Sequence, residues 1–323
     1  MNAEYEKIRP YLADDGQLCR ARLARLEEGS ARGQRIVDVD NGSGLAFTVT
    51  PDRGMNLVEC SFQGIPIAFR TPCGHRAATG NWLGDWTGGL VTGCGLHNVG
   101  SPSGGHGLHG AISGESAEQL SIVVEEGEIA VGGVLREGAL FGANLALRRS
   151  IRTGFQRNVI EIDDLVRNRS ECPQFIEMLY HCNFGYPLVS PELEFDAPEH
   201  EITRRDTAAE AEIGKWCQYP VPLSGFNEHC FLHKLVPAAD GWAAMRIVNR
   251  PLGIAVRLEY DTASLPILVQ WKKPSLHGYV LGLEPTDGSL NGCEFDREHG
   301  YGALLPPGAA RMYRIRLVFE TLA

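Results

Sequence analysis

The stretch RMYRIRLVFE, residues 311 to 320, alternates bulky apolar side chains with charged ones near the end of the chain. In an extended strand the two kinds would occupy opposite faces: Tyr313, Ile315, Leu317 and Phe319 on one, Arg314 and Arg316 on the other. Such alternation predicts a β-strand with one buried and one solvated face. The preceding LPPGAAR, residues 305 to 311, is rich in turn formers and indicates that a tight turn delivers this strand.

Similar alternating stretches occur throughout the rest of the chain toward the N-terminus. IVVEEGEIAVGGVL (122–135) predicts two strands around a turn at residues 126 and 127, and NVIEIDDLVRN (158–168) and LGIAVRLEY (252–260) predict two more. QLCRARLARLEEG (17–29) contains strong helix formers, yet its alternation favours a strand. Strands recur about every 10 to 15 residues without a periodic segment long enough for a crossover helix. The sequence therefore predicts an all-β fold, an antiparallel sandwich or barrel.

Composition limits the function classes. The chain has 323 residues, a formal charge of -10 and no basic stripe, which argues against nucleic acid or an anionic membrane as a partner. Its nine cysteines form no C-x-x-C pair, so a zinc ribbon is not expected, and thiols in this number predict a reducing, cytoplasmic location. The first residues lack a secretory signal pattern, and no run approaches the roughly 18 apolar residues of a membrane span. We expect one domain over residues 1–323, with 1–15 as an extension that can form a short helix; nothing indicates an oligomeric state.

Four stretches place titratable or aromatic groups in apolar strand context. They are GGHGLHGAISG (104–114) with His106 and His109, EMLYHCNFGYPL (177–188) with His181, LPILVQWKK (265–273) with Trp271 and Lys272, and YVLGLEPTDG (279–288) with Glu284. Each also has a structural interpretation: a hydrogen-bonded histidine, a core tryptophan or a turn-capping glutamate. TPDRGMN (50–56) can likewise be a simple turn with Arg53 in solvent.

A metal centre is the competing hypothesis for these histidines. His106 and His109 form an H-x-x-H pair that His181 and Glu284 could complete with nitrogen and oxygen ligands. The pair lies among glycines rather than on a helix, however, and no H-E-x-x-H spacing is present, so no metal is expected. The chain also lacks a G-x-S-x-G elbow, a P-loop and a dinucleotide-binding fingerprint.

Taken in order, the motifs resemble the aldose 1-epimerase-related family of the galactose mutarotase-like superfamily. The resemblance runs from about residue 16 to the C-terminus and is carried by NGSGLAFTVTPDRGMNL (41–57), GGLVTGCGL (88–96), HGLHG (106–110), YHCNFGYPL (180–188), LGLEPTDG (281–288) and PPGAARMYRIRLVF (306–319). It implies a large antiparallel β-supersandwich with a sugar-binding cleft. It also implies a cofactor-free reaction, in which ring opening, rotation about C1–C2 and closure exchange the anomers.

The resemblance assigns roles to three residues. Glu284 would be the base that removes the anomeric hydroxyl proton, His181 the acid that protonates the ring oxygen, and His109 a second histidine that hydrogen-bonds the sugar. Both residue types have pKa values that modest burial can bring toward neutrality. For the substrate we expect an aromatic platform at Trp271, with hydrogen-bond donors from Arg53, His106 and Lys272.

The sequence departs from the better-known galactose mutarotases at its histidine motifs, which leaves the identity of the sugar open. Arg53, Lys272 and Lys273 allow an acidic or phosphorylated sugar. Two alternatives to mutarotation stand beside it. The same acid/base pair could enolise a ketose or a sugar acid and so epimerise or isomerise it. Alternatively, the chain could be a non-catalytic carbohydrate-binding protein, although binding alone does not need the trio His109, His181 and Glu284.

Overall fold

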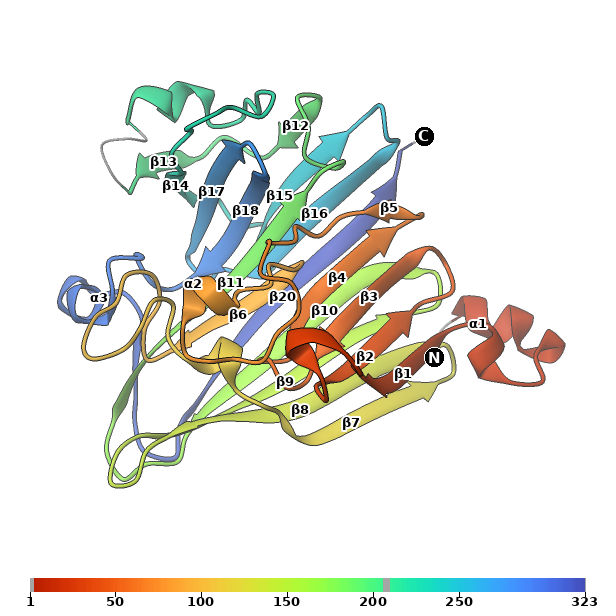
Figure 1. Cartoon of the computed structure of the whole chain (residues 1–323), viewed down its shortest axis with the longest axis horizontal. Helices are drawn as coiled ribbons and strands as arrows, with labels where there is room; N and C mark the ends of the chain where they lie inside the picture. The colour runs from red at the N-terminus through yellow and green to blue at the C-terminus, as the bar shows by residue number, and fades with distance from the viewer. Residues whose placement is uncertain (1–2, 206–209, 323) are drawn as a thin grey trace.

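The computed structural model describes residues 3–205 and 210–322, and its strands form two stacked antiparallel sheets (Figure 1). The strands of the larger, twelve-stranded sheet run in the order β1 (Arg20–Arg25), β2 (Arg35–Asp40), β3 (Leu45–Thr50), β4 (Asn56–Phe62), β6 (Val91–Leu96), β11 (Gln174–Gly185), β18 (Gly278–Thr286), β17 (Ile267–Ser275), β14 (His229–Lys234) and β13 (Glu201–Arg204), while β5 (Ile65–Pro66) pairs with β4 and β19 (Ala303–Leu305) with β11. This sheet provides the candidate site.

The second sheet has eight strands and closes the other side of the core. Their order is β12 (Leu193–Asp196), β15 (Trp242–Asn249), β16 (Ile254–Asp261), β20 (Ala310–Thr321), β10 (Arg157–Asn168), β9 (Asn144–Gly154), β8 (Glu128–Gly138) and β7 (Glu118–Glu125). The predicted strand at 311–320 is therefore β20, in the middle of this sheet, with its four alternating apolar side chains buried. The all-β sandwich predicted from the sequence is confirmed.

Helices are short and lie outside the sheets. The α-helices are α1 (Ala3–Ile8), α2 (Trp82–Asp85) and α3 (Cys293–His299), and the 3-10 turns are Arg9–Tyr11, Asp15–Gln17, Gly29–Ala31, Ile112–Gly114 and Glu210–Lys215. Figure 1 shows α1 and α3 at opposite ends of the molecule. The predicted strand in 17–29 forms as β1 at Arg20–Arg25, so the alternation prevails there over helix propensity. Among the described residues, no helix has the length and apolar character needed to cross a membrane.

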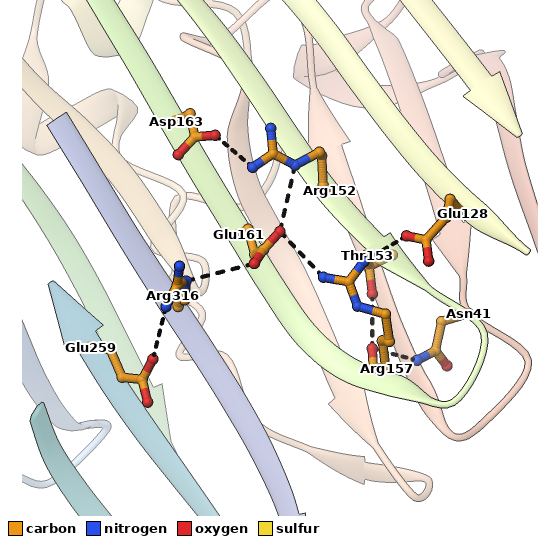
Figure 2. A network of polar contacts seen from close by, with 9 residues as sticks. All are labelled: Asn41, Glu128, Arg152, Thr153, Arg157, Glu161, Asp163, Glu259 and Arg316. Carbon is orange, nitrogen blue, oxygen red and sulfur yellow. Dashed lines mark hydrogen bonds and ion pairs between the residues drawn. The ribbon is translucent and has the colours of Figure 1, made fainter. Parts of the chain in front are cut away.

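The outer face of the eight-stranded sheet is held by ion pairs between neighbouring strands (Figure 2). Glu161 on β10 lies 3.5 Å from Arg152 on β9, 3.3 Å from Arg157 and 3.6 Å from Arg316 on β20, and Arg316 continues to Glu259 on β16. Exposed pairs of this kind each contribute about 0–1 kcal/mol, so they mainly keep this face solvated. The apolar core lies on the opposite side of the sheet, where it meets the larger sheet.

Strand β11 is buried on both faces, and this feature positions the candidate site. Alternate residues such as Met178 and Tyr180 belong to the main core between the sheets. Leu179, on the other face, belongs to a second, smaller apolar cluster with Cys94, Val269 and others. Burial of the outer face requires a cover over the sheet, and the loops around α2 and residues 97–114 contribute to it.

Candidate functional site

Two titratable side chains face each other on the covered face of the twelve-stranded sheet. Cys182 on β11 pairs with Leu283 on β18, so the antiparallel register places His181 opposite Glu284. Nδ1 of His181 lies 3.2 Å from Oε1 of Glu284, and both side chains are buried. Gly282 leaves the room for this contact, because a Cβ there would lie 2.4 Å from Oε1 of Glu284.

Burial favours the uncharged form of both groups. It raises the pKa of Glu284 well above its ordinary value, an effect that Glu228 reinforces and Arg205 opposes. Burial, together with the neighbouring His109, lowers the pKa of His181 to about 3. The contact is therefore a carboxylic acid beside a neutral imidazole, rather than a salt bridge. One transferable proton is available to the two groups.

Asn183 determines which nitrogen of His181 carries the proton. Its Nδ2 donates to the backbone oxygens of Gly89 and His181, so its Oδ1 must be the atom that meets Nδ1 of His181, at 2.5 Å. An amide oxygen only accepts, and Nδ1 of neutral His181 therefore carries the hydrogen. Nε2 is left with a free lone pair, while Oε1 of Glu284 has no hydrogen-bond partner among the described residues. A base and an acid are thus held side by side.

His109 has the opposite tautomer. Its Nδ1 accepts a hydrogen bond from the backbone N–H of Gly100 at 3.2 Å, which leaves the hydrogen on Nε2. Burial lowers the pKa of His109 to about 4, so the ring is neutral and can donate from Nε2. The ring reaches the site because His109 adopts a positive φ of 58° at the end of a glycine-rich loop. His109 and His181 rings meet edge to face, with centroids 5.6 Å apart.

Three tryptophans form the aromatic walls of the site. Asn81 caps the short helix α2, which places Trp82 and Trp86 one turn apart with stacked rings 5.1 Å between centroids. Trp86 contacts the ring of His181 at 5.0 Å, and Trp271 on β17 contacts it from another side at 5.4 Å. Nε1 of Trp271 donates to Oε2 of Glu228 at 2.9 Å, which fixes its ring.

These groups line one cavity of about 400 Å³. Its lining residues are Trp82, Leu83, Trp86, Gly100, Ser101, Leu108, His109, His181, Arg205, Glu228, Cys230, Trp271, Glu284 and Leu290. Apolar walls with a few convergent polar groups are typical of small-molecule sites, and the size is within their usual range of about 300–1,000 Å³.

Comparison with known proteins places the chain in a family. A family model described as a domain of unknown function, DUF4432, matches residues 31–318. The chain belongs to the DUF4432 family. No curated protein matches this DUF4432 chain.

Solved structures share the fold of this DUF4432 chain along nearly its whole length. A proposed aldose 1-epimerase from Klebsiella pneumoniae aligns with a TM-score of 0.87 at 23% identity, covering 94% of this chain and 86% of that one. A galactose mutarotase-like protein from Clostridium acetobutylicum aligns at 0.66 and 13% identity, covering 95% and 100%. Galactose 1-epimerase from Lactobacillus acidophilus NCFM aligns at 0.64 and 11% identity, covering 94% and 100%. The predicted resemblance to mutarotase-like proteins, and the fold it implies, are confirmed.

The structure brings four of the seven predicted site residues of this DUF4432 chain into the cavity: Glu284, His181, His109 and Trp271. It does not bring Lys272 there. Successive residues of β17 point to opposite faces, and Nζ of Lys272 donates instead to the backbone oxygen of Lys215 at 2.9 Å. The expectation that Lys272 contacts a sugar beside Trp271 is corrected by this alternation.

Arg53 and His106 line a neighbouring cavity of about 620 Å³, which shares Trp82, Leu83 and Leu108 with the first. Arg53 is buried, and its guanidinium donates to the backbone oxygens of Arg76 at 2.7 Å and Asp85 at 3.2 Å, so it holds loops together. Both residues therefore line the adjoining cavity rather than the one that holds Glu284.

Sequence reasoning missed four aromatic or charged lining residues: Trp82, Trp86, Arg205 and Glu228. The tryptophans carried a signal, since GNWLGDWTGG (80–89) holds two of the five tryptophans of the chain four residues apart in a glycine-rich segment. Arg205 and Glu228 form an ion pair at 3.2 Å, and neither is marked by its local sequence.

Proposed function

We infer that this DUF4432 chain is an aldose 1-epimerase-like isomerase that interconverts the anomers of a monosaccharide by general acid/base catalysis. The observation that carries the proposal is the buried His181–Glu284 pair, in which a carboxylic acid lies 3.2 Å from Nδ1 of an imidazole whose Nε2 is free to accept a proton. Mutarotation needs a base at the anomeric hydroxyl and an acid at the ring oxygen in the same step. A pair that holds one proton supplies both functions.

In the proposed reaction Glu284 and His181 act together, one as base and the other as acid. With the proton on His181, the Glu284 carboxylate removes the anomeric hydroxyl hydrogen while His181 gives its proton to the ring oxygen, and the C1–ring oxygen bond breaks. Rotation about C1–C2 and closure with the opposite transfers give the other anomer. Each positioned group contributes typically ~10²–10⁴-fold to such a step. His109 assists as a neutral donor to a sugar oxygen, and the Trp271 ring is the platform for the sugar's apolar face.

The charges around the cavity favour a neutral sugar. Arg205 is the cationic side chain of the lining, and Glu228 lies 3.2 Å from it. Lys272 and Arg53, which suggested an acidic or phosphorylated substrate, make their hydrogen bonds elsewhere. Among the residues that the structure describes, an added phosphate or carboxylate would therefore meet no excess positive charge in this cavity.

The test is anomer exchange in a panel of free sugars, followed by NMR exchange spectroscopy in deuterated water. Acceleration of anomer exchange without loss of carbon-bound hydrogen supports mutarotation. Replacement of a carbon-bound hydrogen by deuterium would instead support enolisation of a ketose or sugar acid. Tight binding of a sugar without any turnover would support a carbohydrate-binding protein.

A further inference from the structure

A second group of titratable side chains lies outside the cavity, around the histidine of the glycine-rich loop that the proposed reaction does not use. His97 follows β6, His106 lies in the loop, and Glu137 lies near the end of β8. One candidate ligand atom from each residue lies within 4.8 Å of the others. Among the described residues, no other group of three or more histidine, cysteine, aspartate or glutamate side chains meets this spacing.

We propose that His97, His106 and Glu137 form a binding site for one divalent transition-metal ion. Two imidazoles and one carboxylate are a ligand set typical of Zn²⁺ and related ions, with solvent in the open position. Ligands on one Zn²⁺ ion lie roughly 3–4 Å apart. Binding therefore requires the ligand atoms to approach from within 4.8 Å and the nearly parallel rings of His97 and His106 to turn toward the ion. The proposal does not depend on the sugar chemistry of the neighbouring cavity.

The local backbone presents His106 toward His97. Ser103 and His106 pair across a two-residue turn whose central residues, Gly104 and Gly105, have φ values of 57° and 81°. Glycine adopts these values without the steric cost that other residues incur. The turn stacks the His106 ring on His97, with centroids 5.1 Å apart and planes 6° from parallel. This accounts for two of the glycines next to His106.

The carboxylate is oriented before any ion binds. Oε2 of Glu137 accepts the backbone N–H of Leu96 at 2.8 Å, and Oε1 meets Nδ1 of His97 at 2.5 Å. Outer hydrogen bonds that hold a ligand in this way are characteristic of metal sites. A proton occupies the contact between His97 and Glu137, and a bound cation can take over its role of joining an imidazole to a carboxylate.

The protein's own hydrogen bonds leave ligand atoms unused. No described residue hydrogen-bonds a ring nitrogen of His106, so that ring can offer a nitrogen to a cation beside His97 and Glu137. This assignment differs from the sequence-based expectation of no metal, which considered His106 together with His109. In the structure His109 contacts Trp82 instead, at 4.7 Å.

The experiment loads chelator-treated protein with Co²⁺ and, separately, Zn²⁺. We expect one equivalent of Co²⁺ to bind with visible d–d absorption, without the thiolate charge-transfer band that the cysteines would produce. His106→Ala should weaken Co²⁺ affinity at least tenfold, and Zn²⁺ should raise the Tm of the wild-type protein but not of the variant. His106 is only half-buried, so this variant tests the site with the least risk to folding.

His75 provides a matched control. Its Nε2 lies 3.1 Å from Oε1 of Glu59, a second histidine–carboxylate pair that lacks a third ligand among the described residues. His75→Ala should bind Co²⁺ like the wild type. The proposal is overturned by sub-stoichiometric binding, by a thiolate band, or by a His106→Ala variant that binds as tightly as His75→Ala. Circular dichroism of Glu137→Gln and His97→Ala separates lost ligation from lost folding, and folded variants that keep full affinity would also overturn it.

Discussion

Nδ1 of His181 and Oε1 of Glu284 lie 3.2 Å apart, from adjacent strands, in a cavity walled by tryptophans. Removing either group should abolish the paired proton transfers. We expect Glu284→Gln and His181→Asn each to lower the enzymatic part of anomer exchange by about 10²-fold or more, with little effect on sugar binding. Polarimetry or NMR exchange measures the rates. Glu298→Gln and His299→Asn, both exposed on α3, are the matched controls and should retain the wild-type rate.

The pH profile should show no step at the ordinary histidine pKa. Burial lowers the pKa of His181 to about 3 and that of His109 to about 4, so both stay neutral from pH 5 upward. Burial raises the pKa of Glu284 well above its ordinary value, which keeps the proton on the pair beyond the range where an exposed carboxyl group would lose it. We therefore expect kcat/KM to fall below pH 4, to be flat above pH 5, and to fall again once the pH exceeds the raised pKa of Glu284. An inflection near 6.5 would contradict these assignments.

Asn183 is a positioning residue in this scheme, since it touches His181 rather than the substrate. Asn183→Asp places a carboxylate at Nδ1 of His181, which raises the pKa of the ring and should move the acid limb of the profile toward neutrality. The same change removes the amide donor to Gly89 and should cost about 1–3 kcal/mol in stability. The pH profile is measured below the Tm of the variant. If its acid limb is not shifted from that of the wild type, Asn183 has only a structural role. Asn144→Asp, at an exposed site, is the control.

Trp271 should act on binding more than on rate. Trp271→Phe keeps an aromatic face but loses the hydrogen bond to Glu228, whereas Trp271→Leu loses the flat ring as well. We expect KM to rise modestly in the Phe variant and about tenfold in the Leu variant, a loss of about 1.4 kcal/mol, with kcat nearly unchanged. A fall in kcat at constant KM would instead mean that Trp271 contacts the sugar mainly in the transition state.

The sequence predicts those features that depend on short-range alternation. β20 and the β7–β8 hairpin appear where RMYRIRLVFE and IVVEEGEIAVGGVL place them, because a half-buried strand must alternate. Alternation also limits which neighbouring residues of one strand can face the cavity. Trp271 and Lys272 are consecutive in β17, so only one of them can face the cavity.

The remaining features depend on contacts between distant parts of the chain. Arg205 and Glu228 become neighbours of Glu284 only when β13 and β14 join the edge of the sheet beside β17. Likewise, His97 follows β6 of the larger sheet, whereas Glu137 lies in β8 of the other sheet. Local sequence does not encode such pairings, which follow from the order of the strands.

The last prediction concerns stability and Glu177. This side chain is fully buried on β11, where Oε2 accepts the backbone N–H of Val99 at 3.0 Å. Burial, together with the neighbouring carboxylate of Asp296, raises the pKa of Glu177 to about 9. The folded protein therefore keeps a proton that the unfolded chain releases near its ordinary pKa. The stability from this proton is fully present below the unfolded pKa and is lost as pH rises through about 9.

Glu177→Gln keeps the shape and stays neutral at every pH. Compared with the wild type, the variant should therefore gain stability as the pH rises from 5 to 9. Denaturant unfolding at pH 5, 7 and 9 measures the difference, and exposed Glu298→Gln should follow the wild-type curve. Parallel curves for Glu177→Gln and wild type would mean that Glu177 is already ionised at pH 5. That outcome would contradict the raised pKa of Glu177, because a buried Glu177 anion needs compensation that the Val99 N–H alone does not provide.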